Sequence, residues 1–197
     1  MRKTIKTLCD FLKVNYDANT AKKEKFFREL ADQTPKMVLL TCPYPLRFLE
    51  AEQGMIYSIS SYGGTIPGNE ISLDYALRTL AIPVLVIFGH EDCSAVKGAL
   101  SGQGTTRIFH EMFQSMAPAF EQGRSRKFRD NVLKHIDYQV SLALDRYHDL
   151  VKGEKLVVAG CYSDNSGSLF LTNYNGLRGM DSLCHALPDV DSSFFLE

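Results

Sequence analysis

Two cysteines and a histidine are the residues of this sequence best suited to chemistry. His90 and Cys93 stand three residues apart, and Cys42 stands alone after a separate apolar run. Two thiolates and one imidazole are a typical zinc ligand set, and three protein ligands leave a fourth position for water, as in catalytic sites. These three residues therefore indicate a zinc site, provided that the fold brings Cys42 to the other two.

The same residue types also occur without a metal. Buried cysteines behave as small hydrophobic residues, and a histidine at the end of a strand often only satisfies a backbone carbonyl. Taken by themselves, the residues leave both interpretations open.

The elements around these residues predict where they lie. Continuous apolar runs at residues 37–41 and 84–88 predict parallel strands buried on both faces, ending at Cys42 and just before His90. Further strands are predicted at residues 55–60 and 155–159, with an edge hairpin at 168–172. Helices are predicted near residues 92–100, 108–120 and 128–151, and from a cap at Ser72 to residue 80.

Alternating strands and helices predict an α/β fold, a single domain with a mostly parallel central β-sheet flanked by helices. Ligands of such sheets bind beyond the carboxyl ends of the strands. Cys42 and the segment from His90 to Cys93 both follow predicted strands, so the rule selects the same residues as their chemistry does.

Composition bounds the class of protein. The chain has 197 residues, 45% of them apolar and 23% charged, which suits one ordinary globular domain. A formal net charge of -1 gives no electrostatic case for nucleic acid or an anionic membrane. We expect no membrane span and no secretory signal, hence a cytoplasmic protein, because no long apolar stretch occurs. The odd count of five cysteines indicates reduced thiols.

The sequence resembles the β-class carbonic anhydrases. The resemblance rests on Gln33-Thr-Pro35 followed by Cys42, on Ser72-Leu-Asp-Tyr-Ala76, on Gly89-His90-Glu-Asp-Cys93, on Asn131-Val132, and on Leu156-Val-Val-Ala-Gly160-Cys-Tyr162. It implies a β-carbonic anhydrase-like fold with Zn²⁺ held by Cys42, His90 and Cys93. It also implies reversible hydration of carbon dioxide to bicarbonate, in which zinc lowers the pKa of its bound water to about 7.

The resemblance carries further implications. Residues 1–31 would form an N-terminal helical arm that embraces a neighbouring chain, and residues 32–197 the α/β zinc domain. A homodimer or a dimer of dimers is expected, also because Phe26, Phe27 and Leu30 give such an arm more apolar surface than a free arm leaves in water. Gln33 matches a glutamine that hydrogen-bonds substrate, usually across the dimer interface.

One departure from the family lies directly after Cys42. The family reads Cys-x-Asp-x-Arg there, and the aspartate accepts a hydrogen bond from zinc-bound water. Here Tyr44 and Leu46 occupy the two positions, and Arg47 lies one residue late, which reverses its direction in an extended segment. Tyr44 and Arg47 are the candidate catalytic residues, although Tyr44 can equally only fill space and Arg47 can equally be solvated.

Two more departures lie near the predicted site. The family's Arg-Asn-Ala-Gly-Asn is Ser60-Ser-Tyr-Gly-Gly64 here, so only the glycine at 63 is kept, and Tyr62 and Gly63 are the candidate substrate-binding residues. Ser94 replaces a glycine that usually follows the second zinc cysteine. We therefore expect weak or altered hydration. The alternative is a zinc-binding homologue without hydratase activity, with a structural or partner-binding role, or one that acts on another small electrophile.

The remaining histidines are candidates for proton shuttles. They are His110, His135, His148 and His185. We expect each of them to face solvent from a helix or the tail instead.

Overall fold

The computed structural model describes residues 35–43, 54–102, 104, 106–166 and 168–178. The predicted arm at residues 1–31 lies outside these ranges, as do Gln33, Tyr44, Arg47 and His185. Within the described ranges, no helix combines the length and the apolar character needed to cross a membrane.

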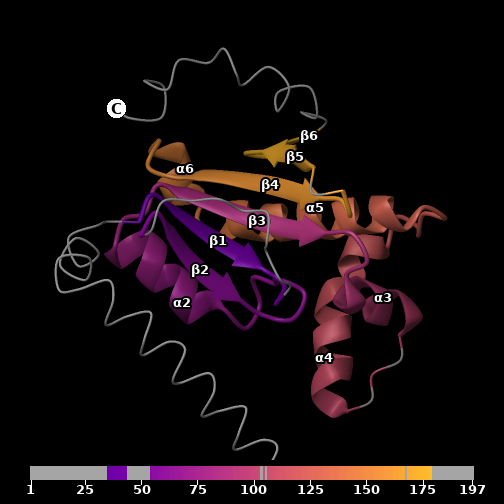
Figure 1. The fold of residues 1–197 in the computed structure, drawn as a ribbon. Coiled ribbons are helices and arrows are strands. Elements are labelled where there is room, and N and C mark those ends of the chain that lie inside the picture. The colour runs from indigo at the N-terminus through magenta and orange to yellow at the C-terminus, as the bar shows by residue number, and fades with distance from the viewer. Residues whose placement is uncertain (1–34, 44–53, 103, 105, 167, 179–197) are drawn as a thin grey trace, which may run out of the picture. The chain divides into compact units, whose positions relative to one another are not determined.

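A six-stranded mixed sheet forms the centre of the fold (Figure 1). Its strands are β1 (Met37–Thr41), β2 (Ile56–Ser60), β3 (Val84–His90), β4 (Val157–Ser163), β5 (Leu169–Tyr174) and β6 (Leu177–Arg178). The spatial order is β2-β1-β3-β4-β5-β6, with the first four strands parallel and the last two antiparallel. The predicted α/β fold and mostly parallel sheet are confirmed.

The register brings the carboxyl ends of β1 and β3 together. Thr41 pairs with Phe88, so Cys42, the residue after β1, lies one residue short of the level of His90, the last residue of β3. Most residues of the apolar runs that predict these strands are buried, with Val38, Leu40 and Leu85 fully covered and Val86 partly exposed. The sheet therefore fixes the spacing of two predicted ligands.

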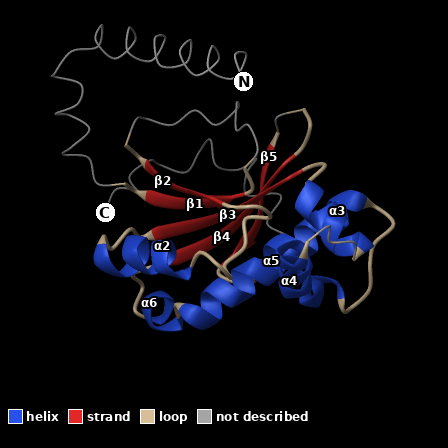
Figure 2. Ribbon diagram, turned by 90° about the horizontal axis from the view of Figure 1, so that it is seen from below, coloured by secondary structure: helices blue, strands red, loops and turns tan. Residues whose placement is uncertain are grey.

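The described helices lie on one face of the sheet and beyond one of its ends (Figure 2). They are α2 (Glu70–Asp74), a π-helical turn η1 (Tyr75–Thr79), α3 (Ser94–Ser101), α4 (Arg107–Met116), a 3₁₀ turn η2 (Ala117–Phe120), α5 (Phe128–Arg146) and α6 (His148–Lys152). Helix α5 packs closely under β3 and β4, because a Cβ at Gly89 or Gly160 would lie 2.6 Å from the Ile136 side chain. This contact places the inner face of α5 beneath the strands that carry the site.

Several predicted boundaries are wrong. The helix expected from a Ser72 cap begins at Glu70, after Asn69, and widens into the π turn η1 before Ala81 takes a left-handed φ of 54°. The helix expected near Asp92 begins at Ser94, because a φ of 60° at Asp92 is incompatible with a helix.

Two later boundaries are also wrong. The helix expected over residues 128–151 is divided at Tyr147, whose buried phenol bonds to Asp74 and whose φ is −112°. The strand expected at residues 155–159 runs from Val157 to Ser163, because its ladder follows β3 as far as His90. The hairpin expected near residues 168–172 is confirmed as β5, which pairs antiparallel with β4.

Candidate metal centre

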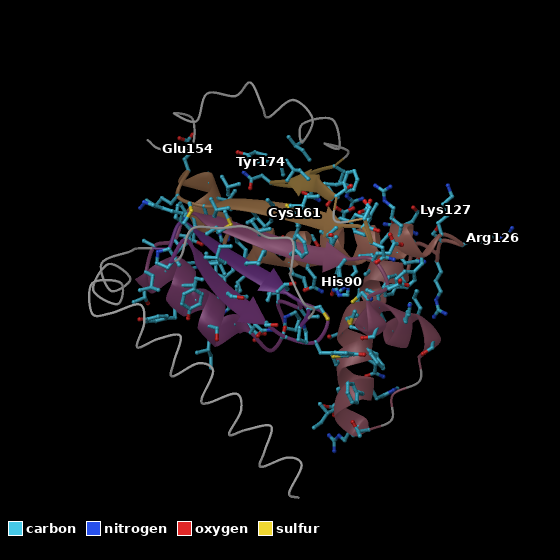
Figure 3. All side chains as sticks on the ribbon, viewed as in Figure 1. His90, Arg126, Lys127, Glu154, Cys161 and Tyr174 are labelled. Atoms are coloured by element: carbon cyan, nitrogen blue, oxygen red, sulfur yellow. The ribbon has the colours of Figure 1, made fainter. Side chains whose placement is uncertain are left out.

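Cys42, His90 and Cys93 meet at the carboxyl edge of the sheet. Their ligand atoms all lie within 4.8 Å of one another, and all three side chains are buried. His90 lies at the head of β3, on the side of α3 and α4 (Figure 3). Elsewhere in the described part of the chain, no three His, Cys, Asp or Glu side chains gather so closely.

The chemistry and spacing of this group fit zinc. A tetrahedral zinc ion with bonds of about 2.3 Å to sulfur and 2.0–2.1 Å to nitrogen separates its ligand atoms by roughly 3.5–3.8 Å. A small contraction of the observed cluster therefore reaches zinc geometry. Two thiolates would balance the charge of the ion, and the three ligands would leave one position for another group.

The two thiols share one proton. The hydrogen bond to Cys93 lowers the pKa of Cys42 to about 7, against the effect of burial and with help from the Gly63 amide. The same contact, together with burial, raises the pKa of Cys93 to about 12. Cys42 is thus the thiolate of the pair near neutral pH, and binding a metal through both sulfurs would release the proton that Cys93 holds.

His90 presents its Nε2 atom to the cluster. Its Nδ1 donates to the carbonyl oxygen of Glu91 at 2.7 Å, which leaves the lone pair on Nε2 in the neutral ring. Burial acts to lower the pKa of His90, but Cys93, the Glu91 carbonyl and the charge of Asp92 together outweigh it, so the pKa is raised. The Glu91 carboxylate in turn accepts a hydrogen bond from the buried Tyr162 phenol.

Cys93 lies at the N-cap of α3. The backbone amide of Val96 in the first turn of that helix acts to lower the pKa of Cys93. A helix N-terminus favours negative charge, so this position supports a thiolate ligand once a metal replaces the shared proton.

Cys42 is held by a glycine turn. The Gly63 N–H donates to Cys42 Sγ at 3.4 Å, and both Gly63 and Gly64 have left-handed φ values, +86° and +59°. A Cβ at Gly64 would lie 3.1 Å from the backbone of Thr41 and Cys42. The turn can approach Cys42 this closely because Gly63 and Gly64 have no side chains.

His135 holds the other side of this turn, and its predicted place in solvent is wrong. Only 4% of the residue is exposed, and its Nε2 donates to the Gly63 carbonyl at 2.8 Å. Burial lowers the pKa of His135 to about 4. A histidine in the middle of an amphipathic helix carries no sequence signal for this contact with a turn 72 residues away. His110 and His148 are exposed, as expected.

The other predicted site residues are only partly described. Tyr62 is half-buried, and its ring packs edge-on against Phe109 of α4 with centroids 5.5 Å apart. Gly63 uses both backbone groups within the protein, in the bonds to Cys42 and His135. The substrate-binding roles of Tyr62 and Gly63 stay predictions, as do those of Gln33, Tyr44 and Arg47.

The sequence profile of the family described as carbonic anhydrase matches residues 44–165, more than half of the chain. This chain belongs to the carbonic anhydrase family. Two relatives, each named carbonic anhydrase, support the assignment. The Pseudomonas aeruginosa protein is 28% identical over 46% of the chain, and the Synechococcus elongatus protein is 30% identical over 51%. The matched parts span 46% and 40% of these relatives' own lengths, less than half of each.

Solved structures assign the fold of this carbonic anhydrase homologue to the β class. The β-carbonic anhydrase CcaA superposes with a TM-score of 0.75 at 17% identity, covering 90% of this chain and 92% of that one. The Coccomyxa β-carbonic anhydrase, solved with acetazolamide, gives 0.70 at 16% identity and covers 94% and 98%. A tetrameric enzyme of Sordaria macrospora gives 0.71 at 15% identity over 86% and 96%. The predicted family and fold are confirmed.

Proposed function

We propose that this protein is a zinc-dependent carbonic anhydrase homologue that hydrates carbon dioxide reversibly to bicarbonate, with weak activity. The observation that carries the proposal is the buried cluster of Cys42, His90 and Cys93, with ligand atoms within 4.8 Å of one another at the carboxyl edge of the sheet. The family match supports the choice of reaction.

Each residue has a distinct part in this proposal. Zinc with an open coordination position acts as a Lewis acid and makes water a nucleophile near neutral pH. Cys42 and Cys93 supply the negative charge that retains the ion, and His90 supplies a neutral ligand whose ring is oriented by the Glu91 carbonyl. Tyr62 and Gly63 are proposed to contact substrate, with Gln33.

Weak activity follows from the segment after Cys42. The family's aspartate and arginine are replaced by Tyr44 and Leu46, and a phenol with a pKa near 10 cannot act as a proton acceptor at neutral pH. Loss of one such positioned polar partner typically costs about 10²–10³ in rate. Tyr44 and Arg47 are proposed as the residues that take its place, at lower efficiency.

A second candidate is zinc binding without hydration of carbon dioxide. The observation that favours it is the same replaced pair, together with Tyr62 packed against Phe109 where the family has a small residue. A structural or partner-binding role, or reaction with another small electrophile, would keep the ligands and lose the hydratase machinery.

We further propose a cytoplasmic homodimer or dimer of dimers, with residues 1–31 as an arm against a neighbouring chain. The tetrameric Sordaria relative supports an assembly. Light scattering should give a mass at least twice the 22.1 kDa of one chain. A monomer at micromolar concentration would contradict the assembly.

Stopped-flow carbon dioxide hydration on protein of verified zinc content tests the function. We expect activity above the Cys93→Ala control and below that of family members with the Asp–Arg pair. Tyr44→Asp with Leu46→Arg should raise it, unless Pro43 and Pro45 hold the segment in the wrong shape. Activity absent from both forms while zinc stays bound would favour the second candidate.

A further inference from the structure

Two buried side chains of helix α5 make hydrogen bonds to the glycine turn that contacts Cys42. His135 donates from Nε2 to the Gly63 carbonyl at 2.8 Å, and Gln139 accepts at Oε1 from the Ile66 N–H at 2.7 Å. The two residues, called here the α5 pair, lie one helical turn apart and are 4% and 0% exposed. They bind both ends of the turn.

Gly63 connects the α5 pair to a metal ligand. Its carbonyl accepts from His135, while its N–H donates to Cys42 Sγ at 3.4 Å. Gly63 takes a left-handed φ of +86°. Because Gly63 and Gly64 are both glycines, the backbone of the turn could adopt many other conformations if nothing held it. Because both bonds are made by one residue, holding its carbonyl also fixes the direction of its N–H.

Burying the two polar side chains of the α5 pair costs free energy. Nδ1 of His135 and Nε2 of Gln139 are buried without a hydrogen-bond partner among the residues described. Such atoms cost free energy that apolar side chains of similar size would not cost. Packing alone therefore does not account for the pair, whereas the bonds to the turn do.

His135 is a constant donor in this position. Burial lowers its pKa to about 4, so the ring is neutral at ordinary pH, with its proton on the nitrogen that faces the Gly63 carbonyl. The strength of its bond to the turn therefore does not change with pH near neutrality.

We propose that His135 is a positioning residue of the metal centre, which acts through Gly63 to direct a backbone N–H at the Cys42 sulfur. Hydrogen bonds to ligand atoms orient the ligand and tune its affinity for the metal. Gln139 supports the same turn at Ile66. This inference rests on the proposed zinc site and concerns how that site is built rather than which reaction it performs.

Cobalt(II) substitution tests the proposal, because thiolate-to-cobalt absorption reports on the ligands themselves. His135→Leu removes the donor and keeps an apolar side chain, and we expect it to bind cobalt and zinc about 10–100-fold more weakly, with altered thiolate absorption. His135→Gln offers an amide donor and should restore most of the affinity. Val140→Ala, on the same helix and also buried, is the matched control for general destabilisation.

The outcomes separate a positioning role from a structural one. His135→Leu with wild-type affinity and spectrum overturns the proposal, and so does an equal loss of affinity in Val140→Ala. Should His135→Leu fail to fold, NMR of the wild-type protein serves instead. The Gly63 amide and the His135 Nε2–H should shift together as zinc is added, and a His135 resonance that stays unmoved overturns the proposal. A wild-type protein that binds neither metal overturns the proposed zinc site itself.

Discussion

His90 and Cys93 are held by their neighbours in sequence, whereas Cys42 is held by residues far along the chain. The Glu91 carbonyl orients His90, and the first turn of α3 supports Cys93. Cys42 depends on Gly63, 21 residues away, and Gly63 depends on His135, a further 72 residues on. One half of the centre is thus a local motif, and the other half exists only in the folded domain.

This difference predicts which part of the metal centre is more sensitive to substitutions elsewhere in the chain. In the local half, the groups that contact the two ligands directly, the Glu91 carbonyl and the Val96 amide, lie within three residues of them in sequence. The Cys42 half needs a glycine turn, a sheet register and an inner helix face at once. Substitutions around Cys42 should therefore couple metal binding to the stability of the fold more strongly than those around Cys93.

The largest expected effect is the loss of zinc, and it is the same for a ligand in either half of the centre. Cys42→Ala and Cys93→Ala should each abolish stoichiometric zinc, because the remaining thiolate undercompensates the charge of the ion. Elemental analysis of purified protein measures this, with Cys161→Ala as a control outside the cluster. If either variant retained its full zinc content, the assignment of that cysteine as a ligand would be contradicted.

The second prediction tests the glycine turn. Gly64→Ala adds a Cβ 3.1 Å from the backbone at Cys42 in a left-handed conformation, and should cost about 4 kcal/mol of unfolding free energy. Gly68→Ala is the matched control, since it is left-handed too but meets nothing within 4 Å, and should cost only about 1–2 kcal/mol. Urea denaturation measures both. An equal loss of unfolding free energy in the two variants would show that the turn shifts to accommodate the added Cβ, which contradicts a tightly packed turn.

The third prediction concerns pH and the buried His135. Its folded-state pKa is lowered to about 4 from the ordinary 6.5, so between these values the unfolded chain binds a proton that the folded protein excludes. The contribution to stability is therefore complete above pH 6.5 and falls as the pH drops toward 4, by up to about 3 kcal/mol.

Urea denaturation of metal-free protein across this pH range measures the loss. His135→Gln lacks the titrating ring, so the difference between the two proteins isolates His135 from every other group. A flat difference would show that His135 is not buried as a neutral donor.

The local half and the sheet could be predicted from the sequence, because each is indicated by residues close together in the chain. The apolar runs before Cys42 and His90 gave strands β1 and β3 at the right places, and the three-residue spacing gave His90 and Cys93 as partners. The role of His135 could not be predicted, since it depends on how α5 packs under Gly89 and Gly160. The π turn begins directly after Asp74 and the helix break lies at Tyr147, and these two residues are joined by a hydrogen bond that the sequence does not indicate.

The smallest expected effect lies away from the metal centre. Asp74 accepts from Arg146 at 2.6 Å and from the Tyr147 phenol at 2.8 Å, but its side chain is 38% exposed. Asp74→Asn should therefore cost about 1 kcal/mol or less, since solvent screens such pairs. Zinc content should be unchanged. Thermal unfolding and elemental analysis on the same sample check both, and a loss of zinc would show that this region is coupled to the centre.

X-ray absorption at the zinc edge tests the central claim most directly, because it reports the atoms around the metal. The account predicts one zinc per chain with two sulfur ligands at about 2.3 Å and at least one nitrogen ligand at about 2.0–2.1 Å. It also predicts that one sulfur is lost in any zinc that Cys42→Ala retains. A shell of nitrogen and oxygen alone, or no stoichiometric zinc after expression with adequate metal, would contradict a centre built from Cys42, His90 and Cys93.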